Sequence, residues 1–137
     1  VDGKPAWFFT EQVFLTQADI REVQLAKGAI AAGIRLLCRQ LGVAIDDVEQ
    51  VLIAGAFGNY MSPDSACAIG LLPASLRQRI VPVGNAAGEG AKLAVLHPEQ
   101  FQLARELSDR VEFLELANDP DFQDIFVEEL SFDAEEE

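Results

Sequence analysis

The chain has 137 residues, half of them hydrophobic, and this suits one compact domain with a buried core. Its formal net charge of −13 at pH 7 argues strongly against a nucleic-acid-binding protein, because such affinity comes mainly from Lys and Arg side chains that neutralise phosphates. The same charge disfavours anionic membrane surfaces, and no apolar run reaches the length of a membrane span. With no signal-peptide pattern at its start, the chain is expected to be cytoplasmic. Because no Met precedes Val1, we expect a piece of a longer protein.

The amino-terminal part of the chain predicts two short strands followed by a long helix. Residues 6–9 and 12–15 predict two strands or one interrupted strand, whose aromatic side chains pack in the core or face a partner. Residues 16–19 have a hydroxyl at the cap and a carboxylate three residues later, which is a capping-box pattern. The helix that starts there is expected to run to about Leu41. Its apolar residues recur at helical spacing and predict a core stripe of Val23, Ile30, Ile34, Leu37 and Leu41.

The rest of the chain predicts strands alternating with helices. A strand starts at Val51, and a second helix is capped by Ser62, has Pro63 at its first position and is closed by Gly70. Residues 80–83 predict a further strand, whose proline suggests a sheet edge or a strand end. The later elements are helices from 84–91 to Leu96 and from Pro98 to Ser108, a partly exposed strand at 111–116, and a helix starting at 118–120. This alternation predicts an α/β layer architecture with largely parallel strand pairing.

Residues 51–60 are the most informative stretch of the sequence. Their branched apolar side chains predict a buried strand that ends in a turn with two glycines. Backbone amides without side chains can approach a phosphate or an adenosine closely at such a turn. The alternative is a tight structural turn between a strand and a helix. The candidate binding residues are Gly55, Ala56, Phe57, Gly58 and Asn59.

A second candidate site lies on the first long helix, where Gln24 and Lys27 are three residues apart and share a face. A lysine stem can lie along adenine while its ammonium and a neighbouring amide hydrogen-bond ribose hydroxyls, with Gly28 giving clearance. The alternative for Gln24 and Lys27 is a solvated polar face. For Gly28 and Gly33 the alternative is close packing of another part of the backbone.

A third glycine-rich segment, residues 84–90, follows a strand and opens a helix, which is also the context of a dinucleotide-binding turn. That interpretation needs an acidic residue at the end of the next strand, for which Glu115 is the candidate. An additional helix intervenes before that strand. The hydride-transfer hypothesis is weakened for this reason.

Residues that could carry catalysis or bind a metal are scarce. His97 stands beside a proline between two helices, where a surface or capping role is expected. Cys38 and Cys67 form no Cys-x-x-Cys pair or Cys/His cluster, so each is expected to be a small core hydrophobe. No nucleophile elbow or Walker loop is present, and no carboxylate stands out as a metal ligand. The acidic residues at 128–129 and 133–137 predict a solvated tail, with docking to a basic partner as the alternative.

Four segments share their order and spacing with one known family across nearly the whole chain. They are LTQADIREVQLAKGAI at 15–30, AGAFGNY at 54–60, IGLLP at 69–73 and VGNAAG at 83–88. Together they resemble the carboxy-terminal domain of the reductive activators of corrinoid proteins. Those activators are similar to the ASKHA superfamily of ATPases, which includes actin, hexokinase and the heat-shock chaperones.

The resemblance implies a fold and a binding site. Residues 1–132 would form a ribonuclease-H-like half-domain of the actin/hexokinase type, with a mixed, largely parallel sheet flanked by helices, and 133–137 would be an acidic tail. Two such halves close over a nucleotide in that superfamily. By this resemblance, the face of Gln24, Lys27 and Gly28 would contact ribose or adenine, and residues 55–59 would form the adenosine turn. Residues 84–90 would pack at a strand–helix junction.

The resemblance also implies ATP-dependent delivery of a low-potential electron to a corrinoid whose cobalt has been oxidised, which returns Co(II) to Co(I). The partners would be a corrinoid protein and a nucleotide, with a homodimer left open. ATP with Mg would be shared with an amino-terminal half that this chain lacks, and an iron–sulfur cluster would lie in that missing region. The chain alone is therefore expected to hydrolyse little or no ATP.

Other functions stay open at the level of sequence. Within the same superfamily, an acyl-CoA dehydratase activator or a small-molecule kinase is an alternative. A docking or dimerisation module without nucleotide chemistry would use the aromatic amino-terminal segment or the acidic tail. A NAD-binding dehydrogenase domain is the weakest of these alternatives.

Overall fold

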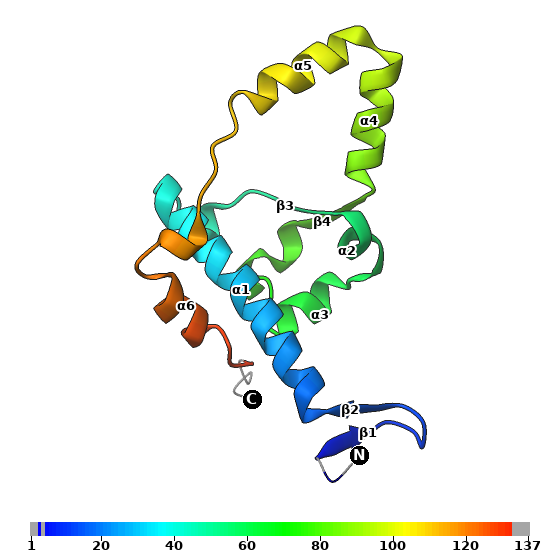
Figure 1. The fold of residues 1–137 in the computed structure, drawn as a ribbon, viewed down its shortest axis with the longest axis vertical. Coiled ribbons are helices and arrows are strands. Elements are labelled where there is room, and N and C mark those ends of the chain that lie inside the picture. Colours follow the sequence, from blue (N-terminus) through cyan, green and yellow to red (C-terminus); the bar gives the residue numbers. More distant parts are fainter. Residues whose placement is uncertain (1–2, 4, 133–137) are drawn as a thin grey trace.

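The computed structural model describes residues 3 and 5–132, so the expected acidic tail at 133–137 lies outside the described residues. A long helix, α1 (Gln17–Leu41), runs diagonally through the molecule, with strands and short helices on one side of it and α6 on the other in the view of Figure 1. The elements around α1 are β3 (Val51–Ala54), α2 (Gly55–Tyr60), α3 (Pro63–Ala68), β4 (Ile80–Gly84) and α6 (Phe122–Glu128). The predicted α/β class is confirmed. None of the described helices combines the length and the apolar character needed to cross a membrane.

Helix α1 begins where the capping box predicts it. The backbone N–H of Asp19 donates to Thr16 Oγ1 at 3.2 Å, and the backbone N–H of Thr16 donates to Asp19 Oδ2 at 2.8 Å. Hydrogen bonding from the Thr16 hydroxyl also lowers the pKa of Asp19, which favours a carboxylate at this positive end of the helix dipole. Gly42 ends the helix in the left-handed conformation, with φ 66°. Both predicted ends of this helix are confirmed.

The buried face of α1 differs from the predicted stripe. Of its five predicted members, Ile34 packs against the core, whereas the others are exposed and Leu41 is 73% exposed. The buried positions are Lys27, Gly28, Ala31, Ala32, Gly33 and Leu36. The predicted stripe was therefore wrong, because small side chains let neighbouring elements approach this helix most closely.

The two predicted amino-terminal strands are confirmed as an antiparallel hairpin of β1 (Ala6–Phe8) and β2 (Phe14–Thr16). Its aromatic side chains do not pack in a core, since Trp7 is 70% exposed and Phe9 is also exposed. The hairpin projects beyond the amino-terminal end of α1, where no other described element covers it (Figure 1). The expected core role was wrong for this reason, and a role facing a partner stays a prediction.

The central strands form a parallel pair, with Val51 of β3 opposite Ile80 of β4. The chain between them forms α2 and α3, and the Ser62 side chain caps α3 by accepting from the backbone N–H of Ser65. Side chains from these elements build the local core, which consists of Ile53, Ala66, Cys67 and Leu72. The predicted start of α3 is confirmed. The larger mixed sheet is not seen, because the described strands form two separate pairs.

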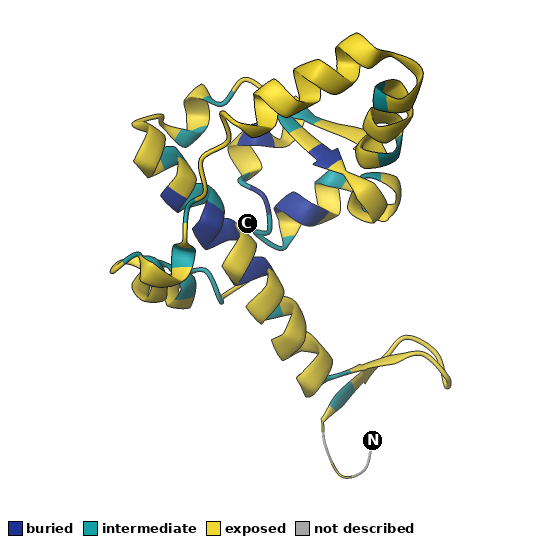
Figure 2. Cartoon of the chain, turned by 45° about the horizontal axis from the view of Figure 1, so that its top comes forward, coloured by how far each residue is buried: buried dark blue, intermediate teal, exposed yellow. Residues whose placement is uncertain are grey.

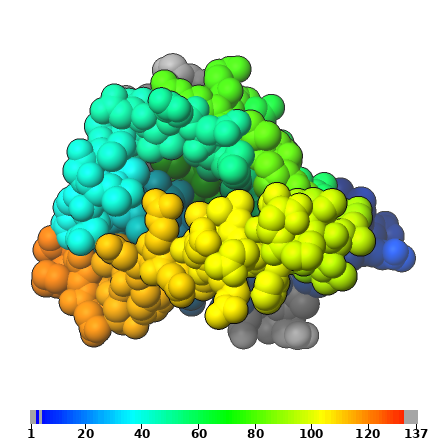
Figure 3. All heavy atoms as spheres, turned by 90° about the horizontal axis from the view of Figure 1, so that it is seen from above, coloured from blue at the N-terminus to red at the C-terminus, as the bar shows by residue number. Residues whose placement is uncertain are grey.

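Helices α4 (Ala86–Leu96) and α5 (Pro98–Ser108) form a helical hairpin that stands away from the rest of the molecule in Figure 1, and Figure 2 shows that this hairpin is almost entirely exposed. Neither helix has a buried residue. Figure 3 shows a hollow between this hairpin and the chain around residues 40–60. The predicted strand at 111–116 was wrong, because its alternating side chains have no neighbouring strand to pair with, and Phe113 is 85% exposed.

Gly58 predicts a measurable packing constraint. A Cβ there would overlap the carbonyl oxygen of Ile53 and lie 3.1 Å from the backbone nitrogen of Gly84. Gly58→Ala is therefore expected to lower the free energy of unfolding by about 1–3 kcal/mol, as overpacked sites do. Urea-induced unfolding measures this change. Gly90→Ala is the matched control, since a Cβ there meets no atom within 4 Å, and equal stabilities for the two variants would contradict the prediction.

Candidate functional site

Lys27 is the one charged side chain that is buried among the described residues, with an exposed fraction of 1%. Its side chain makes no hydrogen bond or ion pair with any other described residue. At the same time, no fully buried side-chain nitrogen or oxygen in residues 3 and 5–132 lacks a hydrogen-bond partner. Since Lys27 Nζ has no partner, it cannot be fully buried, and it must contribute to the 1% of the residue that is exposed. The stem is thus buried in the protein, and the ammonium keeps only a trace of exposure and has no described protein partner.

Gln24 lies one turn before Lys27 on α1 and is half-buried. It lines a groove of about 180 Å³ together with Arg21, Leu25 and Leu130. The solvated alternative is wrong for Lys27, because that side chain is covered by the protein. Contact of Gln24 and Lys27 with a ribose or adenine stays a prediction.

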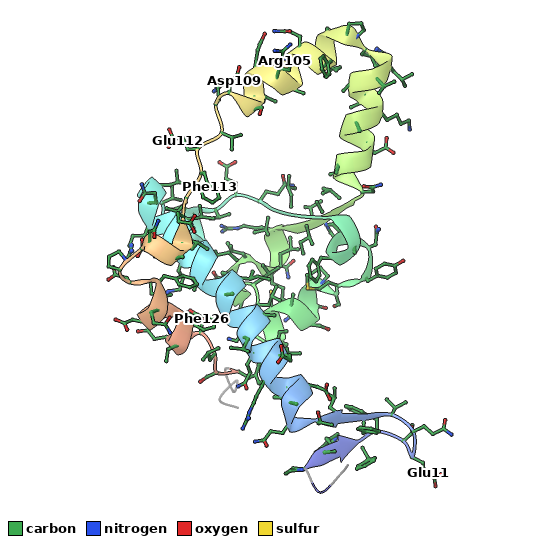
Figure 4. The ribbon with its side chains drawn as sticks, viewed as in Figure 1. Glu11, Arg105, Asp109, Glu112, Phe113 and Phe126 are labelled. Atoms are coloured by element: carbon green, nitrogen blue, oxygen red, sulfur yellow. The ribbon has the colours of Figure 1, made fainter. Side chains whose placement is uncertain are left out.

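The glycines of α1 make room for the carboxy-terminal part of the chain. A Cβ at Gly28 would lie 3.2 Å from Leu130 Cδ2 and 3.4 Å from Phe126 Cε2. Figure 4 shows Phe126 on α6, beside α1. A Cβ at Gly33 would lie 3.4 Å from Leu116 Cδ1. Packing is therefore the explanation that the structure supports at Gly28, whereas a Cβ at Gly33 would make an ordinary contact. Phe126 and Leu130 fill the space that Gly28 was expected to leave for a ligand.

The predicted glycine turn lies at the junction of β3 and α2. Gly55 has φ 71°, a conformation that favours glycine, and a Cβ there would meet no atom within 4 Å. Ala56, Phe57 and Asn59 are exposed around it, with Phe57 62% exposed. Gly58 packs against the backbone of β3. Gly58 therefore serves the tight structural turn, whereas Gly55 leaves its backbone open to approach.

The two candidate regions belong to different packing units. Helix α2 packs on β3 and β4, whereas α1 packs mainly on α6 and meets the central core through Ile34. The groove beside Gln24 includes no residue from 55–59. The structure therefore gathers Gln24, Lys27 and Gly28 on one helix and residues 55–59 on another, and a shared adenosine pocket stays a prediction.

Residues 84–90 form a helix start. The side chain of Asn85 caps α4 by accepting from the backbone N–H of Gly88 at 3.0 Å, and a Cβ at Gly88 would crowd that same side chain. Glu115 follows an irregular segment and does not end a strand. The dinucleotide alternative thus lacks the acidic residue that it requires at a strand end.

Two arginines on α1 hold the carboxy-terminal segment through four carboxylates, which sequence reasoning missed. Arg35 Nη1 donates to Glu129 Oε1 at 2.9 Å and to Glu128 Oε2 at 3.0 Å. These hydrogen bonds raise the pKa of Arg35 further above its ordinary value. The solvated role expected for residues 128–129 is therefore wrong for Glu129, whose side chain is 22% exposed, whereas the Glu128 side chain stays 64% exposed. No local sequence pattern could have found partners so distant along the chain.

The second arginine repeats the arrangement one helical turn later. Arg39 Nη1 donates to Asp121 Oδ2 at 2.6 Å, and its Nη2 donates to both carboxylate oxygens of Asp119 at 3.0 and 3.1 Å. The bond to Asp121, followed by that to Asp119, raises the pKa of Arg39. A fork of this kind fixes geometry as well as charge.

The remaining candidates have structural roles. Cys67 is buried, and burial raises the pKa of its thiol, while Cys38 is half-buried; both are free thiols. His97 is exposed at the start of α5, which confirms the expected surface or capping role. No group of three His, Cys, Asp or Glu side chains suited to a metal ion occurs within the part of the chain that the structure describes.

These observations define an α/β domain with an open glycine turn and a buried lysine on its longest helix. Comparison with known families identifies it more closely: the family described as the C-terminal domain of RACo, the ASKHA domain, matches residues 5–137. The chain belongs to this family. The resemblance found in the sequence is thereby confirmed.

Individual relatives agree with the family. The chain is 39% identical over 117 residues to the corrinoid activation enzyme RamQ of Eubacterium limosum, covering 85% of this chain and 20% of that protein. It is 28% identical over 120 residues to a [Co(II) methylated amine-specific corrinoid protein] reductase of Methanosarcina barkeri, covering 86% of this chain and 22% of that protein. The chain thus spans about a fifth of the length of these curated relatives.

A solved structure supports the same assignment. The reductive activator for corrinoid, iron–sulfur protein matches with a TM-score of 0.74 and 34% sequence identity. The match covers 83% of this chain and 18% of the solved chain. The fold is therefore shared with one part of a much larger activator.

Lys27 predicts a stability effect in the absence of any ligand. Because its buried side chain carries an ammonium without a protein partner, Lys27→Met is expected to raise the free energy of unfolding by about 1 kcal/mol. Thermal unfolding without nucleotide measures this. Lys92→Met is the control, since Lys92 is exposed and pairs with Glu89 on α4. A loss of stability in Lys27→Met would show that the ammonium has a stabilising partner after all.

Proposed function

We propose that this chain is the nucleotide-binding half of an ATP-dependent reductive activator, which helps to deliver a low-potential electron to the Co(II) corrinoid of a methyl-transfer protein. The observation that carries the proposal is the similarity of residues 5–137 to the ASKHA domain of RACo, together with relatives named as corrinoid activators. A corrinoid protein would be the partner, as the names of the relatives suggest for them.

The finer fold is part of the proposal. We infer that the pairs β1–β2 and β3–β4 are portions of a ribonuclease-H-like half-domain that other parts of a longer protein complete. Isolated two-stranded sheets are marginal in water, so neighbouring strands would stabilise both pairs. The other half would close over the nucleotide, and an iron–sulfur cluster would lie elsewhere in the longer protein.

The chemistry of the α1 face fits the sugar and base of a nucleotide. The Lys27 ammonium has three N–H donors and no described protein acceptor, while the Gln24 amide both donates and accepts. Ribose hydroxyls would satisfy both groups, and the open backbone at Gly55 with residues 56–59 would form the opposing wall. Magnesium would be held by the phosphates and by the other half, because the described residues offer no cluster of ligands for it.

The role of nucleotide in this proposal is conformational. A ligand shifts a protein between conformations only by the difference in its affinity for them. ATP bound between two halves would favour the closed arrangement, and that arrangement would favour the complex in which the electron passes to cobalt. Lys27 and Gln24 would bind and orient the adenosine, without taking part in electron transfer.

Nucleotide titration of the intact protein tests the proposal. Lys27→Met is expected to weaken ATP binding about 10- to 100-fold, the range for losing a hydrogen bond from a charged group, and Gln24→Ala less. Isothermal titration calorimetry measures both affinities, with Lys92→Met as the control. Unchanged affinity in both site variants would refute the assignment of this face.

A docking module without nucleotide chemistry is the second candidate, because the aromatic hairpin is exposed at Trp7, Phe8 and Phe9. In that case the intact protein would not bind ATP through Gln24 or Lys27. Trp7→Ser would instead weaken binding to a corrinoid protein, measured by surface plasmon resonance, whether or not nucleotide is present.

A further inference from the structure

The carboxy-terminal segment carries a strong excess of negative charge. Nearly half of the acidic residues of the chain follow residue 110, and no Lys or Arg does. Such a segment repels itself and needs cations from elsewhere to be held in place. The structure supplies them from α1, where Arg35 and Arg39 each bind two carboxylates of residues 119–129.

The arginines hold this segment against the candidate site. Leu130 fills the space above Gly28 and also lines the groove beside Gln24. Phe132 and Val23 line a neighbouring apolar pocket of about 230 Å³ on the same helix. Residues 126–132 therefore lie along the stretch of α1 that carries Gln24 and Lys27.

The contacts that hold the segment are of two kinds. The apolar contacts include those of Phe126 and Leu130 at Gly28, and the ring of Phe126 also stacks on that of Phe122 with centroids 5.8 Å apart. The ionic contacts lie at the surface, since the Arg35 and Arg39 side chains are both more than a third exposed. Exposed ion pairs are individually weak and are screened by salt, so salt weakens this part of the attachment.

We propose that residues 122–132, held by Arg35 and Arg39, form a salt-sensitive lid over the Gln24–Lys27 face of α1, and that this lid must loosen before adenosine can reach that face. The inference rests on the proposed nucleotide site. It adds a regulatory step, because the apparent affinity for nucleotide is the intrinsic affinity multiplied by the fraction of molecules in which the lid is open. Any partner that attracts the acidic segment or competes for the arginines would open the site.

The test uses the intact protein with Glu128 and Glu129 both replaced by Gln. This double variant removes the two ion pairs of Arg35 and keeps the size of the side chains. Asp64→Asn is the matched control, because it removes an exposed ion pair with Arg77 that involves no residue of 119–132. Two readouts are taken. The rate of Lys27 acylation by an amine-reactive reagent is followed by mass spectrometry, with exposed Lys92 as the internal standard, and the affinity for adenosine is measured by calorimetry.

The double variant is expected to raise both the acylation rate of Lys27 and the affinity for adenosine about two- to tenfold, and the control is expected to change neither. Raising NaCl from about 0.1 M to about 1 M, which shortens the Debye length from about 10 Å to about 3 Å, should have the same effect on the wild type and less on the double variant. Adenosine is the probe because it is uncharged, so salt acts on the lid and not on the ligand.

The outcomes separate the lid from the nucleotide site. Unchanged acylation in the double variant overturns the lid, whatever the nucleotide data show. Faster acylation with unchanged adenosine affinity also overturns it, because the segment would then cover Lys27 without blocking the ligand. If acylation rises but neither adenosine nor ATP binds any form of the protein, the proposed nucleotide site fails while the cover over Lys27 stands.

Discussion

The close approach of neighbouring elements to the middle of α1 is the constraint on which the rest of the structure depends. This stretch is lined by glycine and alanine, and the buried positions Gly28, Ala32 and Gly33 leave room for larger side chains from other elements. Leu130 and Phe126 enter that room from one side and Leu116 from further along. Because protein interiors are closely packed, a methyl group at Gly28 would press against Leu130, whose side chain would have to shift by a few tenths of an ångström. A helix with a bulky stripe here could not hold the carboxy-terminal segment in the same place.

That close packing also creates the chemistry of the candidate site. Lys27 lies within the small-residue stretch, and its stem is enclosed while its ammonium has no described protein partner. A charge held in this way costs stability in the ligand-free protein and is suited to a ligand that supplies acceptor oxygens. Residues 126–132 lie along the same stretch of α1, since Leu130 packs at Gly28 and lines the groove beside Gln24.

The glycine turn after β3 serves a different physical purpose at each of its two glycines. Gly58 allows α2 to pack on the strand that precedes it, whereas Gly55 keeps an open backbone at a left-handed conformation. The turn is thus rigidly seated on the small parallel sheet while one of its residues stays accessible. The chain that carries both features belongs to the ASKHA domain family of RACo and spans about a fifth of the length of its curated relatives.

Local chemistry in the sequence determined the ends of α1, the start of α3 and the parallel strands that flank it, because caps, left-handed glycines and short apolar runs act over a few residues. Only the tertiary structure decided which face of α1 is buried. The sequence periodicity follows the large apolar side chains, whereas neighbouring elements approach α1 most closely at its small residues. It also decided that the pattern at 111–116 is not a strand and that the aromatic hairpin is exposed, because both depend on whether a neighbour is present. The pairing of Arg35 and Arg39 with residues 119–129 is of the same kind, as it joins side chains that only the folded chain brings together.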